Sequence, residues 1–281
     1  MNHLLGWIVP TDSLVTPGVY CAVSMTAALL VGISKAGFGG GVGALATPLI
    51  LLILPAPTAL ALTLPMLLGC DVFTIRHFSR EWDRTAFRAI FPWMFGGLFL
   101  GLALLVAFAR SGGRGDLWIR FAAGASVIGL TSLSLLPGRF AAPRRRTTAP
   151  PSRPTAAAVG LVCGITTMVA HAAGVLLNLF LLRRRPSPAS FVGTSTRLYL
   201  SFNALKVPLF VAASPLAGRA FLTWTTFGHS LWLLPAGWMG VTIGARLHRS
   251  FTPDGHRTTV TVLLLVSGVY LIASSWLALA R

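Results

Sequence analysis

The chain has 281 residues, of which 54% are hydrophobic and 10% are charged, and its formal net charge is +17. Apolar stretches about 20 residues long recur along it, each sufficient to cross the ~30 Å hydrocarbon layer of a bilayer. The arginines collect in short loops between these stretches, which indicates membrane orientation and argues against nucleic-acid binding. No stretch has the roughly ten-residue alternation of an outer-membrane barrel. The composition predicts an all-α, polytopic helical membrane protein.

Hydropathy predicts two sets of five helical segments. In chain order, the first set is 18–36, 44–54, 58–76, 88–109 and 117–137. The second set is 155–170, 174–183, 190–212, 220–245 and 258–280. A linker rich in Pro and Arg separates the two sets. We therefore expect a first membrane repeat over 1–137, a cytoplasmic linker over 138–154 and a second membrane repeat over 155–281.

The two halves resemble each other in the order and spacing of their segments. Each opens with a helix interrupted by small residues, continues with a short apolar piece and ends with three longer spans. Placing Thr63 opposite Ser195 also places Asp71 opposite Asn203. This pattern indicates an internal repeat in which each half contains one broken-helix hairpin.

Arginine-rich loops predict the orientation of the chain. The loops 76–88 and 183–185 and the linker are rich in arginine, whereas residues 1–17 contain no Lys or Arg. Basic loops face the cytoplasm, so both termini are expected to be periplasmic, in a multi-pass protein of the inner membrane. The loop 110–120 is an exception, because it carries three arginines and faces outward in this topology.

This topology predicts that the two hairpins enter the bilayer from opposite sides. The piece 44–54 reaches only ~16 Å, about half of the hydrocarbon thickness. Inverted repeats with discontinuous helices are typical of secondary transporters, whose sites lie near the midplane where the breaks meet.

The first break is the run from Gly37 to Gly41, which is interrupted only by Phe38 and follows Lys35. Each glycine costs a helix ~1 kcal/mol relative to alanine, and unwound backbone in a bilayer must be buried in protein or line a cavity. Free amides at a helix start can bind an anion. Glycines also permit close helix crossings, which is the competing interpretation. Candidate anion ligands are Gly39, Gly40, Gly41 and, at the second break, Gly174.

Buried charges form the second signal. The only two lysines, Lys35 and Lys206, both fall within apolar segments, and Asp71 is the only acidic residue inside a predicted span. Two interpretations remain open. The lysines and Asp71 could form a structural pair, or the lysines could attract an anion while Asp71 takes up and releases a proton.

Uncharged and weakly basic groups complete the candidate site. His171 lies at the second break, where it could bind the anion, shuttle a proton or simply be a buried histidine. Thr194 and Asn203 supply donors on one segment, although such groups in membrane helices also bond neighbouring helices. Arg197 is either a site residue or an interfacial anchor.

Catalysis has little support in the sequence. There is no carboxylate pair for hydrolysis, no Ser-His-Asp spacing and no His/Cys cluster for a metal. We therefore expect no catalytic residue, no metal and no cofactor. The expected partners are a small anion and the lipid bilayer, without nucleic acid. The oligomeric state is left open, with a homodimer as one candidate.

The chain resembles the TauE/SafE family, the sulfite exporters. In the first half the resemblance rests on the run Lys35 to Gly41, Thr47-Pro48, Pro65, Asp71 and Glu81-Trp82. In the second half it rests on the runs Ala170 to Gly174, Phe191 to Thr194 and Asn203 to Lys206.

The resemblance implies carriage of a small anion such as sulfite or a sulfonate, coupled to the proton or electrochemical gradient. The second glycine motif departs from the family pattern, because Ala173-Gly174-Val175 replaces a double glycine followed by proline. The departure bears on the substrate more than on the fold. The alternatives are a channel or cation carrier, or else an integral-membrane enzyme or an accessory subunit of a membrane complex. One aspartate against two lysines argues against a cation carrier.

Overall fold

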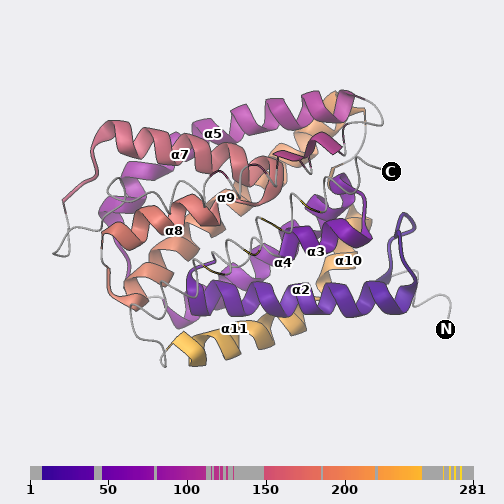
Figure 1. Cartoon of the computed structure of the whole chain (residues 1–281), viewed down its shortest axis with the longest axis horizontal. Coiled ribbons are helices and arrows are strands. Elements are labelled where there is room, and N and C mark those ends of the chain that lie inside the picture. The colour runs from indigo at the N-terminus through magenta and orange to yellow at the C-terminus, as the bar shows by residue number, and fades with distance from the viewer. Residues whose placement is uncertain are drawn as a thin grey trace.

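The computed structural model describes residues 8–40, 46–78, 81–111, 149–184, 186–218 and 221–248, with isolated positions elsewhere. Every regular element within these ranges is a helix, and five of the helices (α2, α4, α5, α7 and α9) are long and apolar enough to cross a membrane. The prediction of an all-α polytopic membrane protein is therefore confirmed. Figure 1 labels the helices α2 (Pro17–Phe38), α3 (Ala46–Ile53), α4 (Ala56–His77), α5 (Arg84–Arg110), α7 (Arg153–Ala170), α8 (Gly174–Arg183), α9 (Pro188–Ala217), α10 (Trp224–Leu231) and α11 (Leu234–His248).

Helix starts follow local sequence chemistry. α2 begins with proline at its first turn, where the missing N–H has no partner to lose. The side chain of Asp83 caps α5 by accepting a hydrogen bond of 2.9 Å from the amide of Ala86. Thr223 and Thr226 form a reciprocal capping box at the start of α10. These short-range signals fix where the helices begin.

One predicted span is wrong. The segment 220–245 is not a single helix but the two helices α10 and α11. Pro235 lies in the first turn of α11 and has no N–H to donate to Leu231, the last residue of α10, so the helix stops there. The amide of Leu233 turns back to the carbonyl of Ser230 at 3.1 Å instead. The predicted spans 117–137 and 258–280 fall largely outside the described residues.

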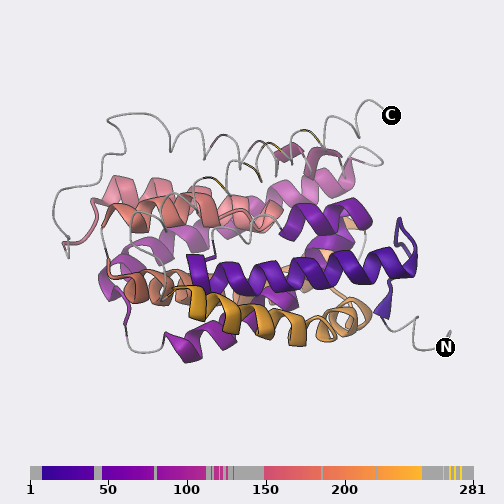
Figure 2. The ribbon, with the colours of Figure 1, turned by 60° about the horizontal axis from the view of Figure 1, so that its bottom comes forward.

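The hairpins of the two halves open in opposite directions. In Figures 1 and 2, α2 runs from the right, where the N-terminus is marked, toward the left, and α3 lies back on the right. α7 begins on the left and runs to the right, and α8 lies back on the left. The arrangement agrees with the expected entry of the two hairpins from opposite sides.

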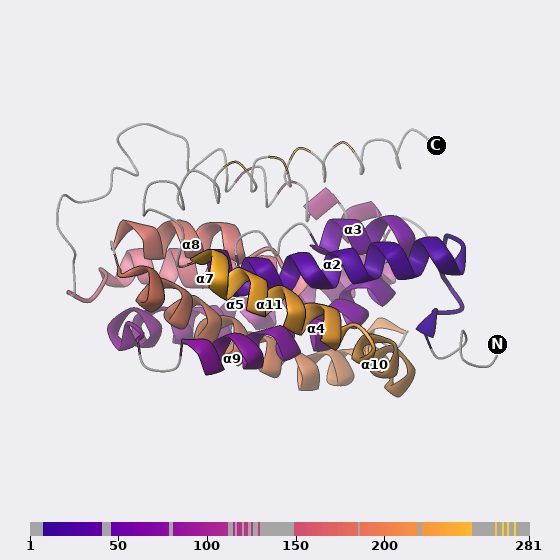
Figure 3. The ribbon, with the colours of Figure 1, turned by 90° about the horizontal axis from the view of Figure 1, so that it is seen from below.

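Glycine-lined crossings join each half to the other. α2 packs along α11, and α5 packs along α7, in the two most extensive helix contacts among the described elements. Figure 3 shows α11 lying along α2. A Cβ on Gly32 would overlap the carbonyl oxygen of Gly237, and one on Gly164 would overlap that of Met94. Both crossings therefore depend on the absence of a side chain, as close helix contacts in bilayers commonly do.

We expect Gly32→Ala to destabilise the protein by about 1–3 kcal/mol, because the added methyl has no space between α2 and α11. Gly18→Ala on the same helix is the matched control, since nothing lies within 4 Å of its added Cβ. Thermal unfolding of the two purified variants in detergent measures the difference. Equal midpoints would show that the crossing is not tightly packed.

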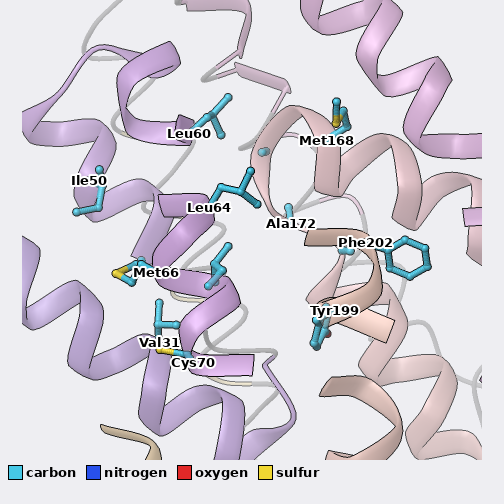
Figure 4. Close-up of a cluster of buried hydrophobic side chains, with 14 of the residues drawn as sticks. Val31, Ile50, Leu60, Leu64, Met66, Cys70, Met168, Ala172, Tyr199 and Phe202 are labelled. Atoms are coloured by element: carbon cyan, nitrogen blue, oxygen red, sulfur yellow. The ribbon is translucent and has the colours of Figure 1, made fainter. Parts of the chain in front are cut away.

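The apolar core lies where the two halves meet. In Figure 4, Leu60 and Leu64 of α4 lie opposite Met168 of α7 and Ala172 at the second break. Each of these four side chains is at most 1% exposed. Core side chains thus lie directly beside the second helix break, where any polar group needs a hydrogen-bond partner.

Candidate functional site

The first break is a left-handed turn that only glycine fits. α2 ends at Phe38, and Gly39 and Gly40 follow with φ of 61° and 82°. The amide of Gly40 donates to the carbonyl of Ser34 at 2.9 Å. A Cβ on Gly40 would lie 2.6 Å from the ring of Tyr199, so conformation and space both require glycine. Of the predicted ligands here, Gly41 lies outside the described residues.

The second break repeats this geometry with a different residue. α7 ends at Ala170, and His171 takes the left-handed φ of 53°, the one positive φ of a non-glycine among the described residues. The amide of Ala172 donates to the carbonyl of Thr166 at 3.2 Å, six residues back, as Gly40 does to Ser34. α8 then begins at Gly174 without a side-chain cap.

Lys35 and Asp71 form a buried ion pair. The Lys35 ammonium lies 2.5 Å from Oδ1 of Asp71, and both residues are at most 3% exposed. Asn203 donates its side-chain amide to the other carboxylate oxygen at 2.9 Å. Asp71 and Asn203, placed opposite each other by the sequence repeat, are therefore in direct contact. The carboxylate is satisfied on both oxygens, so this part of the site is electrically neutral.

Lys206 contacts no acidic side chain among the residues that the structure describes. Its ammonium contacts the carbonyl of Thr167 at 3.0 Å, the hydroxyl of the same residue at 3.2 Å and Nδ1 of His171 at 2.6 Å. Three acceptors match the three N–H donors of an ammonium group. The side chain is fully buried. The Lys206 ammonium is thus hydrogen-bonded by neutral protein groups, and none of these contacts neutralises its charge.

The partners of His171 assign its tautomer. Nε2 lies 3.2 Å from the carbonyl of Leu60, which can only accept, so Nε2 carries the proton. Nδ1 is then the acceptor for Lys206. A neutral imidazole satisfies both contacts, and it links the second break to α4 and α9. We call Lys35, Asp71, Thr167, His171, Asn203 and Lys206 the lysine cluster.

Residues missed by the sequence analysis connect the cluster to the first break. The ring of Tyr199 lies under the Lys35 ammonium at 4.4 Å, within cation–π range. Its hydroxyl donates to Asn178 of α8 at 3.2 Å, and the Asn178 amide donates to the carbonyl of Phe38 at 3.2 Å. The C-terminal end of α2 is therefore hydrogen-bonded to α8 of the second hairpin. Nothing in the sequence around Tyr199 or Asn178 marks them for this role.

Thr167 is the other missed residue, and the repeat contained a signal for it. It precedes His171 by four positions, as Lys35 precedes Gly39, so the two occupy matching places before their breaks. Lys35 carries a positive charge at this place in the first half, whereas Thr167 accepts hydrogen bonds from Lys206 at this place in the second half.

Two candidates lie outside the cluster. The hydroxyl of Thr194 donates to Ser190 at 2.6 Å and accepts from the amide of Asp83 at 2.8 Å, beside the Arg184–Asp83 ion pair. Arg197 donates to the carbonyl of Gly193 at 2.9 Å and lies over the ring of Trp82. The anchoring interpretation of Arg197 agrees with these contacts.

Hydroxyls without a partner among the described residues lie near the first break. Ser34 and Thr196 are fully buried, Thr47 is 1% exposed, and their hydroxyls have no hydrogen-bond partner in the described part of the chain. Thr47 is the second residue of α3, which follows the first break. Buried donors without acceptors are unusual because each costs free energy, and an oxyanion would accept from them.

Comparison with known proteins identifies one match. The family model described as "Sulfite exporter TauE/SafE" matches residues 24–271. The comparisons with curated proteins and with solved structures gave no match.

Proposed function

Because the chain belongs to the TauE/SafE sulfite exporter family, whose members are membrane transporters, we propose that it is a secondary transporter of a small anion. The proposed substrate is sulfite, a sulfonate or another organic anion, carried across the inner membrane. The observation that carries this proposal is Lys206, a buried cation held by neutral groups alone. Such a cation is costly in a bilayer and attracts a negative charge.

The anion is proposed to bind between the two breaks, beside the lysine cluster. Lys206 supplies charge, while the amide of Gly174 and the buried hydroxyls without a described partner supply hydrogen bonds. The amides of Gly39 and Gly40 donate to the carbonyl of Ser34 in this structure, so they would bind the anion only after leaving that carbonyl. Gly41 remains a proposed ligand on sequence grounds. Thr194 is not included, because its hydroxyl is already engaged at Asp83.

Asp71 and His171 are the proposed coupling groups. A proton on Asp71 would remove the charge that holds Lys35. A second proton on His171 would occupy the Nδ1 lone pair and place two cations in contact with each other. Either event changes the charge of the site and hence its affinity for an anion. The arginine-rich loops support cytoplasmic placement of the linker 138–154 and periplasmic termini.

An integral-membrane enzyme or accessory subunit is the alternative. Within the described ranges no three His, Cys, Asp or Glu side chains gather as a metal site would require. The six residues of the lysine cluster are, however, all buried, which favours a carrier over an enzyme that works at a membrane surface.

Purified protein in liposomes tests the proposal. We expect a gradient of sulfite or of a sulfonate to drive flux above that of protein-free liposomes. The matched control is the same preparation containing Lys206→Ala, which lacks the unneutralised cation. Conversion of the substrate without flux would favour the enzyme, and absence of flux for every small anion tested would contradict transport.

A further inference from the structure

The number of charges in the lysine cluster limits the charge of the anion that it accepts; this inference rests on the proposed function. Two groups in the cluster carry a positive charge, Lys35 and Lys206, and one carries a negative charge, Asp71. His171 is neutral, because its Nδ1 accepts a hydrogen bond from Lys206. The sum is one positive charge. Among the described residues, Cys70 on α4 and Tyr199 on α9 face the cluster, and Cys163 on α7 lies near Tyr199. All three are uncharged in their ordinary protonated forms.

Two buried or half-buried arginines are engaged by groups outside the lysine cluster. Arg184, which follows the last residue of α8, is paired with Asp83 at 2.9 Å, and Arg197, in the third turn of α9, donates to backbone carbonyls beside Trp82. The donors near the first break that lack a partner in the described part of the chain are hydroxyls, which stabilise an oxyanion without adding charge. Charge and hydrogen-bonding capacity are therefore supplied by different groups.

We infer that the site carries oxyanions with a single negative charge. It rejects dianions, unless a proton binds together with the dianion and reduces the net charge to one. One negative charge beside Lys206 makes the buried site neutral. A second negative charge would have no partner, since the ammonium of Lys35 is already neutralised by Asp71. An uncompensated charge inside hydrocarbon is strongly unfavourable. Sulfonates and hydrogensulfite meet the condition, whereas sulfate does not.

Asp71 thereby becomes the residue that determines the permitted charge. Removing the negative charge of Asp71 raises the net charge of the lysine cluster from +1 to +2, counted from two lysines and one aspartate. A site of that charge is matched by a dianion. The contact from Asn203 positions Asp71 on Lys35 rather than on the anion.

The experiment measures flux of methanesulfonate and of sulfate into identical proteoliposomes at the same pH and ionic strength. Both anions are small and tetrahedral, and they differ in charge. We expect methanesulfonate to be carried at least about 100-fold faster by the wild-type protein, given the penalty for an unpaired buried charge. Sulfate carried as fast as methanesulfonate would overturn the inference while leaving anion transport intact. Absence of flux for both anions and for sulfite would instead contradict the proposed function, and the inference with it.

Methanesulfonate differs from sulfate in its methyl group as well as in its charge. The variant Asp71→Asn shows which of the two differences determines the ratio of the fluxes. We expect the variant to shift the ratio of the two fluxes toward sulfate by at least about tenfold, in line with the added positive charge. A merely structural role for Asp71 would lower both fluxes together and leave the ratio unchanged, which would contradict the assignment. If the variant does not accumulate in the membrane, the wild-type comparison decides the inference.

Discussion

Lys206→Ala is expected to abolish anion flux without reducing the amount of protein in the membrane. Of the two buried lysines, the substitution removes the one that contacts no acidic side chain in the described part of the chain. Hydrogen bonds to charged groups contribute about 1.5–3 kcal/mol each, so loss of the ammonium should lower the transport rate at low substrate concentration by at least ~100-fold. Initial flux in proteoliposomes, normalised to reconstituted protein, measures the effect.

Thr74→Val on α4 is the matched control. Thr74 follows Asp71 by three residues, as Lys206 follows Asn203, so it occupies the corresponding place in the first half. Its hydroxyl donates to the carbonyl of Cys70 on its own helix, and we expect its loss to change the flux by less than about twofold. Wild-type flux in Lys206→Ala would remove Lys206 from the site.

Asp71→Leu is expected to destabilise the protein by about 3–5 kcal/mol, because the ammonium of Lys35 is then buried without a counter-charge. The double variant Lys35→Met/Asp71→Leu should recover most of that loss, since an apolar pair of similar volume is often as stable as a buried ion pair. Thermal unfolding in detergent, measured for both single variants and the double variant, gives the coupling free energy.

Thr63→Val is the control variant for this double-mutant cycle. Thr63 lies two turns before Asp71 on α4, is equally buried and bonds only its own helix. We expect its replacement to cost less than ~1 kcal/mol. A double variant no more stable than Asp71→Leu would show that Lys35 and Asp71 act independently, against the observed contact.

Hydropathy and glycine content were sufficient to predict most of the fold. The first-half hairpin was predicted as 18–36 and 44–54 and is observed as α2 and α3, because long apolar runs and a glycine cluster leave few alternatives in a bilayer. The division of 220–245 was missed, although Pro235 was visible in the sequence. Proline is tolerated inside α4, α5 and α9, so its presence alone does not predict a break.

The charged members of the site were predictable, and their contacts were not. Lys35, Lys206 and Asp71 were conspicuous because charge is rare in apolar segments. Which lysine meets Asp71 depends on how α2, α4 and α9 cross, which is tertiary information. Tyr199 and Asn178 were missed for the same reason, because an aromatic and an amide in a helix have many ordinary packing roles.

The glycine crossings determine which helices can move together. The opening helix of each half is pressed against a late helix of the other half, α2 on α11 and α7 on α5. Neither half of the sequence is thus free to rotate as a unit while these contacts persist. Under the proposed transport function, a rigid body that moves during the transport cycle would therefore combine helices of both halves, and its boundary would not coincide with the predicted linker 138–154.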